Sequence, residues 1–242
     1  MSVLLVAGTR TGVGRTTTVA ALAACAIAAG GASPPSVVAV KPVQTGAAPG
    51  EAADLAVVQR LAPQVDTREF ARFPDALAPH HAAWVGRAPA LPFADTVRHI
   101  DDLDAAYDLV LVEGVGGLLT PFDPDRRWTL LDLAADLHCP VLLVVDVGVD
   151  AVADTALAVA RLEDEQIPLA GVLVGRWPAE PDLAARCAVG DLQGLAPDRR
   201  LAGALPDGLS SGGRFAARAR AALGPAWGGR FDSRAFVAAQ VP

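Results

Sequence analysis

The sequence predicts an α/β fold: a doubly wound, mostly parallel sheet with helices on both faces. Short Val- and Leu-rich runs alternate with longer Ala- and Leu-rich segments, which is the pattern of successive βαβ units. The short runs are apolar throughout rather than at every second position, as expected for strands buried on both faces. With no internal repeat and no dividing linker in the sequence, residues 1–242 are predicted to form a single domain.

The apolar runs and the spacing of apolar residues predict individual elements. Six strands are expected, over residues 3–7, 37–40, 109–112, 141–145, 169–174 and 201–204. Helices are expected over residues 16–29, 131–137 and 151–165, with Gly30-Gly31 ending the first of them. The Pro-rich residues 74–92 are predicted to be a loop with room for one short helix.

Composition narrows the class of protein. The chain is 52% hydrophobic but only 5% aromatic, which favours an Ala/Val/Leu core and argues against disorder. A net charge of −7 excludes general nucleic-acid binding, which needs a basic face. Cys25, Cys139 and Cys187 lack disulfide or metal spacing and are expected to be buried free thiols. Since neither a signal peptide nor a membrane-spanning segment is apparent, a cytoplasmic protein without a membrane partner is expected.

A Gly-rich turn follows the first predicted strand and opens the first helix. It reads Gly8-Thr9-Arg10-Thr11-Gly12-Val13-Gly14-Arg15-Thr16-Thr17. Backbone N–H groups in such a turn close around a phosphate, aided by the helix dipole, and Thr16 would offer its hydroxyl to Mg2+. The strict P-loop pattern fails twice, because five residues separate Gly8 from Gly14 and Arg15 stands where Lys is expected. The turn favours a P-loop NTPase-like fold, and the alternative is a plain tight turn.

Charged residues follow two further strands. The second strand is expected to end in Lys41-Pro42-Val43-Gln44-Thr45-Gly46, and the third in Glu113-Gly114-Val115-Gly116-Gly117. Taken singly, Lys41 could be a snorkelling surface lysine and Glu113 a solvated carboxylate before a turn. Because ligands bind at the carboxyl ends of parallel strands, three such strand ends are instead expected to converge on one site.

Three ordered segments resemble the signature segments of dethiobiotin synthetases. They are Gly8-Thr9-x-Thr11-x-Val13-Gly14-x-Thr16, Lys41-Pro42-Val43-x-Thr45-Gly46 and Val112-Glu113-Gly114-x-Gly116-Gly117. The segment Gly171-Val172-Leu173-Val174-Gly175-x-Trp177-Pro178 is similar to the nucleotide-base loop of actinobacterial members. The resemblance covers most of the chain, and the ordered set is more specific than any one motif.

The resemblance implies a nucleotide-binding ligase domain over residues 1–242. Such an enzyme uses ATP, or another nucleotide such as CTP, with Mg2+ to close a ureido ring from 7,8-diaminononanoate and CO2 through a carbamate-phosphate. It would be a homodimer whose partners are a diamine and a nucleotide, without nucleic acid. The implied catalytic residues are Lys41, Thr45, Arg15 and Thr11, and the implied Mg2+ ligands are Thr16, Asp54 and Glu113. The implied nucleotide contacts are Gly12, Val13, Gly14, Arg15, Thr16, Thr17, Glu113, Gly116, Gly117, Gly175, Trp177, Pro178, Pro206, Asp207 and Leu209.

Two positions depart from the family pattern. Arg15 presents a planar fork in place of the compact ammonium of lysine, so slower turnover or altered nucleotide preference is expected. Where the family has an Asn-containing segment that receives the substrate carboxylate, this chain has Asp150, Ala153 and Asp154. Both carboxylates suit a helix N-terminus, but they would repel a substrate carboxylate. Asp54 has a plain alternative as a helix-start carboxylate.

Other functions stay open at this point. The chain could be a paralogue acting on another amine, a catalytically retired nucleotide binder, or a nucleotide switch of the partition-ATPase type. Against the switch stand the Lys41–Gly46 segment and the lack of a basic amphipathic membrane helix at the C-terminus. His80, His81, His99 and His138 fall away from the strand ends, so no catalytic histidine is expected.

Overall fold

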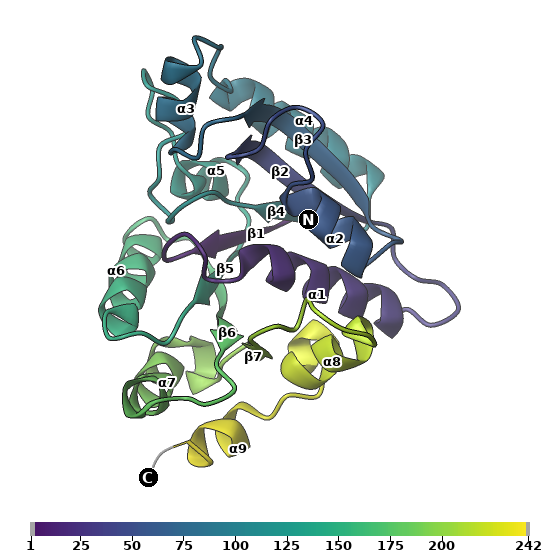
Figure 1. Cartoon of the computed structure of the whole chain (residues 1–242), viewed down its shortest axis with the longest axis vertical. Helices are drawn as coiled ribbons and strands as arrows, with labels where there is room; N and C mark the ends of the chain where they lie inside the picture. Colours follow the sequence, from purple (N-terminus) through teal and green to yellow (C-terminus); the bar gives the residue numbers. More distant parts are fainter. Residues whose placement is uncertain (1–2, 241–242) are drawn as a thin grey trace.

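A seven-stranded sheet runs through the computed structural model, which describes residues 3–240 (Figure 1). The strand order is β3-β2-β4-β1-β5-β6-β7, and every neighbouring pair is parallel. The doubly wound parallel α/β fold is therefore confirmed. The strands are β1 (Val3–Gly8), β2 (Val37–Thr45), β3 (Asp66–Phe73), β4 (Leu109–Glu113), β5 (Val141–Val145), β6 (Leu169–Trp177) and β7 (Gly203–Pro206).

Helices cover both faces of the sheet and enclose two hydrophobic cores. One core lies under α1 (Arg15–Ala29), α2 (Asp54–Leu61) and α8 (Phe215–Ala222). The other core lies under α3 (Pro79–Val85), α4 (Phe93–Ala106), α5 (Leu130–Asp136), α6 (Ala151–Asp164), α7 (Leu183–Leu195) and α9 (Ser233–Ala238). Two short 3-10 turns, η1 (Pro197–Arg199) and η2 (Pro225–Trp227), complete the described elements. No helix among residues 3–240 is long and apolar enough to cross a bilayer.

The strand predictions were wrong in four places, one of which is that β6 continues for three residues beyond its predicted end. β2 continues to Thr45, so Lys41 lies inside a strand rather than after one. Beyond Val40 only β3 pairs with β2, and this one-sided pairing accommodates Pro42, which has no amide hydrogen. β3 itself was missed because it is a half-exposed edge strand rich in charged residues. The last strand begins at Gly203 rather than two residues earlier.

The predicted helices agree with α1, α5 and α6 to within one residue at each end, and Gly30 is the C-cap of α1 as expected. The Pro-rich loop contains the short helix α3. The remaining helices escaped the sequence analysis because they bury few residues; α4, for example, buries only Phe93, Thr96 and Ile100.

Two of the three cysteines are buried free thiols as expected, and the third is not. Burial raises the pKa of the Cys25 thiol to about 11 and that of Cys139 to about 12. Cys187 is exposed, because α7 turns Ala185, Ala188 and Val189 toward the core and leaves Cys187 on its outer side.

Candidate nucleotide and ligase site

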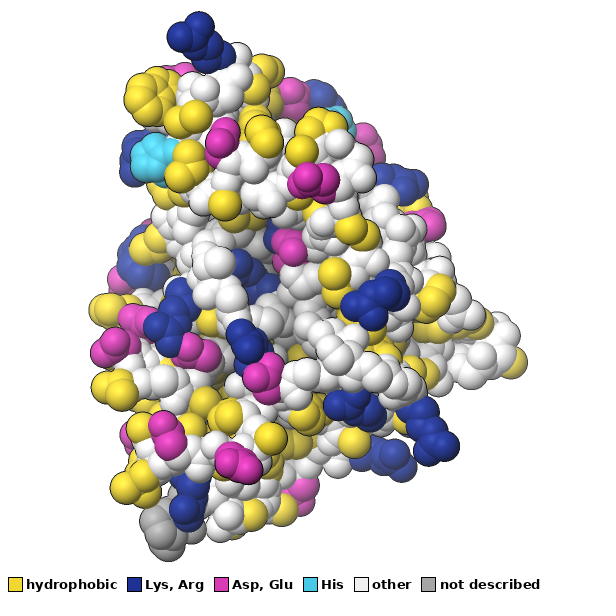
Figure 2. Space-filling view, in the orientation of Figure 1, with side chains coloured by type: hydrophobic (Ala, Val, Ile, Leu, Met, Phe, Trp, Pro, Cys, Tyr) yellow, Lys and Arg dark blue, Asp and Glu magenta, His cyan; other side chains and the backbone are white. Residues whose placement is uncertain are grey.

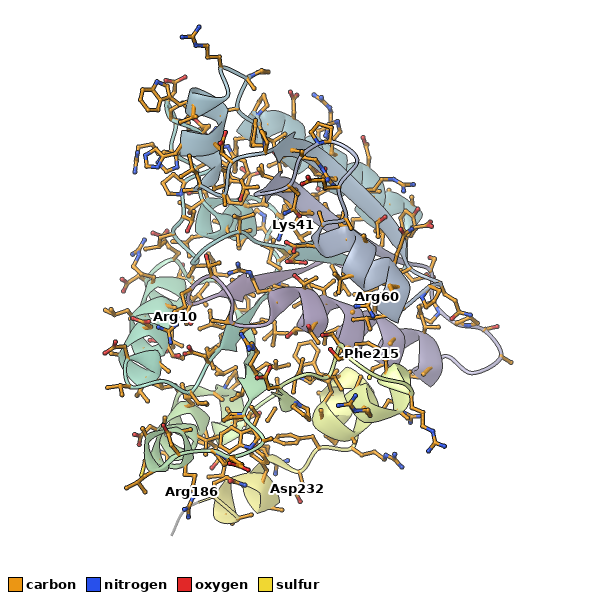
Figure 3. The ribbon with its side chains drawn as sticks, in the orientation of Figure 1. Arg10, Lys41, Arg60, Arg186, Phe215 and Asp232 are labelled. Carbon is orange, nitrogen blue, oxygen red and sulfur yellow. The ribbon has the colours of Figure 1, made fainter. Side chains whose placement is uncertain are left out.

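A cavity of about 550 Å3 lies at the carboxyl ends of β1, β2 and β4, where parallel sheets bind ligands. Its walls come from the Gly-rich turn, the end of β2 and the loop after β4, which are far apart in sequence. Figure 3 shows Lys41 and Arg10 on either side of this region. Lining residues already implicated by sequence are Thr11, Arg15, Lys41, Thr45, Asp54, Gly116 and Gly117.

The Gly-rich turn takes its shape from two close backbone approaches. Gly14 adopts φ 97°, a left-handed conformation that favours glycine, and it precedes α1 directly. A Cβ at Gly14 would overlap the carbonyl of Gly175, and a Cβ at Gly175 would overlap the carbonyl of Val13. The turn is therefore docked on the end of β6, with the N-terminus of α1 facing the cavity side. Neither Gly14 nor Gly175 can carry a side chain without moving the turn.

Arg15 is buried and joins two loops. Its Nη1 donates to the carbonyl oxygens of Arg10, at 3.2 Å, and of Gly116. Only 8% of the residue is exposed, and this burial lowers the pKa of its guanidinium, against the opposing charge of Glu113. Arg15 therefore lines the cavity as expected, and it also connects the phosphate-type turn to the loop after β4.

Lys41 lies in a buried charge cluster at the base of the cavity. Its Nζ is 2.7 Å from Glu113 Oε1 and 2.6 Å from Asp54 Oδ2, and it donates to the Gly114 carbonyl at 3.2 Å. Lys41 and Glu113 are only 3% and 1% exposed, whereas Asp54 is 36% exposed. A buried ammonium needs such anionic partners, so Glu113 and Asp54 fix the Lys41 side chain at the cavity.

Oxygen ligands of the kind Mg2+ prefers gather beside Lys41. The Thr16 hydroxyl donates to Glu113 Oε1 at 2.8 Å, and Gln44 Oε1 accepts from the Asp54 amide at 3.3 Å. Glu113 Oε2 is buried without a hydrogen-bond partner. The Glu113, Thr16 and Asp54 oxygens fit a hard cation in their chemistry. Residues 3–240 contain no group of three His, Cys, Asp or Glu side chains arranged as a complete metal site.

Unpaired buried atoms concentrate at this edge of the sheet. Of the four buried side-chain polar atoms without a partner in residues 3–240, three lie here: Thr9 Oγ1, Glu113 Oε2 and Asp146 Oδ1. Because buried polar groups in native proteins are nearly always paired, such a concentration marks a place where a ligand completes the hydrogen bonding.

Arg10 of the Gly-rich turn pairs with Asp146, which follows β5. The pKa of the Arg10 guanidinium is raised chiefly by the hydrogen bond to Asp146, and the charges of Asp154 and Asp150 add to the effect. Asp150 is the N-cap residue of α6 but makes no side-chain capping hydrogen bond. One cation thus faces three carboxylates beside the cavity.

The predicted base-binding residues lie at the ends of β6 and β7, next to the turn. Arg176 Nε and Nη2 lie 3.2 and 3.3 Å from the two Asp207 oxygens, and Arg176 Nη1 donates to the Gly12 carbonyl at 3.4 Å. The Trp177 ring packs edge-on against Phe236 of α9, and Leu209 is 1% exposed in the core under α1. The side chains of Trp177 and Leu209 are thus engaged in packing, and the Trp177 carbonyl and the Leu209 amide are hydrogen-bonded within the protein, to the Asp207 amide at 2.7 Å and the Pro206 carbonyl at 3.0 Å.

The structure brings the predicted catalytic and metal-binding residues together, and it adds others that the sequence analysis missed. Asp146 follows β5 directly, so the strand-end rule that found Glu113 could also have found it. Arg176 and Gln44 lie inside segments already identified by motif, but their partners are set by tertiary structure. The four histidines line no part of the cavity.

Comparisons with known proteins agree with this geometry. A family model described as an AAA domain matches residues 2–210. The chain is 47% identical to the ATP-dependent dethiobiotin synthetase BioD of Frankia casuarinae over 98% of both chains. It is 43% identical to that of Streptomyces avermitilis over the whole of both chains, and 44% identical to that of Saccharopolyspora erythraea over 96% of this chain and all of the relative.

Among solved structures, a chain of the MinC:MinD cell division protein complex of Aquifex aeolicus matches with a TM-score of 0.54. The match covers 90% of this chain and 86% of that chain. Because the identity is only 15%, it supports the P-loop NTPase-like fold and nothing further. The identities over nearly full length, together with the ordered strand-end residues at one cavity, show that the chain belongs to the dethiobiotin synthetase family.

Proposed function

We propose that this protein is an ATP-dependent dethiobiotin synthetase, a cyclo-ligase that forms the ureido ring of dethiobiotin from 7,8-diaminononanoate and CO2. The observation that carries the proposal is the buried Lys41 ammonium, paired with Glu113 and Asp54 beside the Gly-rich turn. A cation fixed at that point can neutralise the negative charge that develops when a carbamate attacks the γ-phosphate.

The reaction forms three bonds in sequence. An amine of the substrate adds to CO2 and forms a carbamate, whose oxygen attacks the γ-phosphorus and releases ADP. The second amine then attacks the carbamate carbon, the ring closes, and phosphate leaves with the carbamate oxygen. Lys41 would hold the carbamate and the transferring phosphoryl group, and Thr45 and Thr11 would orient them from the cavity wall. The turn from Gly12 to Thr17 would bind the phosphates through backbone N–H groups.

We propose that Thr16, Asp54 and Glu113 hold Mg2+, since their oxygens face one another around Lys41. When bound, Mg2+ would supply positive charge that offsets the negative charge of the phosphates. The chain's own contribution is to fix the carboxylates: Gln44 accepts from the Asp54 amide, and Thr16 donates to Glu113. Release of Lys41 from one carboxylate would free that carboxylate for the cation.

Arg15 would contact the β- and γ-phosphate oxygens from the position that the family gives to lysine. Its Nη1 is engaged with two carbonyl oxygens, which leaves the other guanidinium nitrogens for phosphate. At the substrate end, Arg10 would offset the charge of Asp150 and Asp154, which otherwise oppose a substrate carboxylate. With Arg15 in place of lysine and Asp150 and Asp154 in place of the Asn-containing segment, this chain would turn over at a different rate from a relative that has lysine and asparagine there.

The nucleotide base would lie against Gly175, Pro178, Pro206 and the backbone of the neighbouring residues, with ATP as the expected nucleotide. We propose that the protein works in the cytoplasm as a homodimer, each chain forming one nucleotide-binding ligase domain. Val149, just before α6, and Leu157, within it, are 86% and 69% exposed, which supports a subunit contact there. Figure 2 shows hydrophobic side chains gathered along the left edge, over α6 and α3.

The experiment is to incubate the purified protein with ATP, MgCl2 and bicarbonate, with and without diaminononanoate, and to measure phosphate and dethiobiotin. Diamine-dependent phosphate release with one dethiobiotin per phosphate is expected. Tight nucleotide binding without product would support a retired nucleotide binder. Phosphate release that depends on another amine would support a paralogue.

A further inference from the structure

A second cavity, of about 740 Å3, lies at the amino ends of β6 and β7. Its lining includes Gly171 at the start of β6 and Ala202 just before β7. The proposed nucleotide site lies at the carboxyl ends of the strands, so the two cavities lie at opposite ends of the strands. Figure 3 shows Asp232, the N-cap residue of α9, near the bottom of the molecule and well below Lys41. Nothing in the proposed reaction uses this second cavity.

Three arginines line it, and none of them is paired. The side chains of Arg200, Arg230 and Arg234 make no hydrogen bond or ion pair with any residue from 3 to 240. They come from three separate segments, after η1, after η2 and from the first turn of α9. All three are exposed, and their guanidiniums gather on one cavity although the chain has a net charge of −7. Guanidinium matches phosphate oxygens in geometry and charge, so this surface is suited to an anion.

Two aspartates share the lining, and they do not cancel these charges. Asp232 Oδ1 accepts from the backbone amides of Arg234 and Ala235, both at 3.0 Å, so its charge faces the N-terminus of α9. Asp198 is exposed in η1, with no side-chain partner among the described residues. Three arginines against two aspartates leave an excess of positive charge in the lining, which favours an anionic ligand.

The same cavity offers an aromatic surface. Trp227 and Phe231 are half-buried in its wall. The indole packs over Gly171, where a Cβ would lie 3.5 Å from its ring. Flat ligand rings stack on such an indole, and arginine adds cation–π attraction to a bound ring. A ligand that satisfies both features has a flat ring and a phosphate.

The walls of the cavity are held in place without a ligand. The Gly224 amide donates to the Ala202 carbonyl at 2.8 Å, and the Phe231 amide donates to the Leu223 carbonyl at 2.8 Å. Ser233 Oγ accepts from the Leu201 amide at 2.8 Å and ties α9 to the approach to β7. Asp198 and Arg199 adopt φ 53° and 50°, a left-handed backbone that is uncommon outside glycine and recurs at binding sites. A preformed cavity of this size suits a small organic ligand.

We propose that this second cavity binds a small aromatic phosphate, of the chemical class of a nucleoside monophosphate, independently of the nucleotide site. The Arg200, Arg230 and Arg234 guanidiniums hold the phosphate, and Trp227 stacks on the ring. The assignment does not rest on the proposed function, because the residues, the sheet edge and the ligand differ.

The test uses the full-length protein and 4-fluorophenyl phosphate, whose 19F resonance broadens when it binds. We expect the Arg230→Gln/Arg234→Gln double variant to weaken binding at least 10-fold. Trp227→Leu should weaken 4-fluorophenyl phosphate but not inorganic phosphate, and AMP should displace the probe. Arg199→Gln is the matched control, since Arg199 is an exposed neighbour that does not line the cavity; it should bind as the unaltered protein does.

Dethiobiotin formation should be unchanged in all three variants, which separates this site from the catalytic one. Thermal unfolding should be unchanged in the double variant and in Arg199→Gln, whereas Trp227→Leu should unfold at a lower temperature because it loses packing against the core. Equal binding by the unaltered protein and the double variant would overturn the proposal. So would an Arg199→Gln loss as large as that of the double variant, because binding would then reflect general surface charge. Inorganic phosphate binding as tightly as the aromatic phosphate would overturn the aromatic half of the assignment.

Discussion

Two ion pairs at the carboxyl edge of the sheet differ in burial. Lys41 and Glu113 are 3% and 1% exposed at the β2–β4 side, whereas Arg176 and Asp207 are 54% and 49% exposed at the β6–β7 side. Charges removed from water depend on their partners, so loss of one member of the buried pair leaves an uncompensated charge. Water solvates the members of the exposed pair individually. The charges on the β2–β4 side therefore depend on one another, whereas those on the β6–β7 side can separate and be solvated by water.

The largest expected effect comes from Glu113→Gln, which removes the most buried charge of the cluster. Lys41 would keep only Asp54 as a charged partner, so we expect a loss of about 3 kcal/mol in the free energy of unfolding. Dethiobiotin formation should fall by about 100-fold or more. Urea unfolding and a product assay measure the two effects.

Glu180→Gln is the matched control, because Glu180 is exposed and its side chain makes no hydrogen bond or ion pair with any residue from 3 to 240; it should leave both quantities unchanged. An unfolding midpoint for Glu113→Gln equal to that of the control would contradict the burial argument.

A second large effect is expected from Gly175→Ala, which tests the contact between the Gly-rich turn and the end of β6. The added Cβ would overlap the Val13 carbonyl and push the Gly-rich turn away from β6. We expect a loss of about 2–3 kcal/mol in unfolding free energy and a raised KM for ATP. The control is Gly194→Ala in α7, where a Cβ meets nothing within 4 Å and the helix should gain about 0.5–1 kcal/mol. Similar stabilities for the two variants would show that the turn is not docked.

Arg15→Lys has an intermediate expected effect. A lysine ammonium ends one bond short of Arg15 Nη1, which donates to the carbonyls of both Arg10 and Gly116, so about 1–2 kcal/mol of unfolding free energy should be lost. The KM for ATP or kcat should also change severalfold, as measured by steady-state phosphate release. If stability, KM and kcat all stayed as they were, Arg15 would not belong to the phosphate site.

The smallest effect is expected from Asp207→Asn on the exposed side. Arg176 holds the pKa of the Asp207 carboxyl below its usual value of 3.8. A depressed folded-state pKa stabilises the fold above the unfolded pKa, and this contribution disappears as pH falls through the folded value. Because the pair is half exposed, the difference between the unaltered protein and the variant should be at most about 1 kcal/mol at pH 7 and should shrink as the pH falls below 3.8. Thermal unfolding across this pH range measures it; a difference that grew toward low pH would have the wrong sign.

The contrast between the two sides also explains what the sequence could predict. Gly14, Lys41 and Glu113 were identified because each follows or ends an apolar run, and the parallel sheet then brings those ends together. Asp54 was assigned to the site through the family resemblance, and its ion pair with Lys41, 13 positions away, was not predicted because no local pattern pairs side chains at that separation.

Other features required the tertiary structure. β3 lies at an edge and carries charged residues, so it lacks the continuous apolar run that marked the central strands. Trp177 was expected to flank a base, but contacts with Phe236 from the distant helix α9 engage its ring. Arg15 was read as a phosphate ligand alone, and its second connection, to the Gly116 carbonyl, spans 101 positions along the chain.

The central claim is that the Lys41 cluster promotes attack of a carbamate oxygen on the γ-phosphate, and oxygen labelling tests it most directly. The protein would be supplied with ATP, MgCl2, diaminononanoate and C18O2, and phosphate and dethiobiotin would be analysed by mass. One 18O atom in the released phosphate and one in the ureido carbonyl are predicted, both lost in Lys41→Met. Phosphate that carries oxygen from water alone would mean simple ATP hydrolysis and would contradict the assignment.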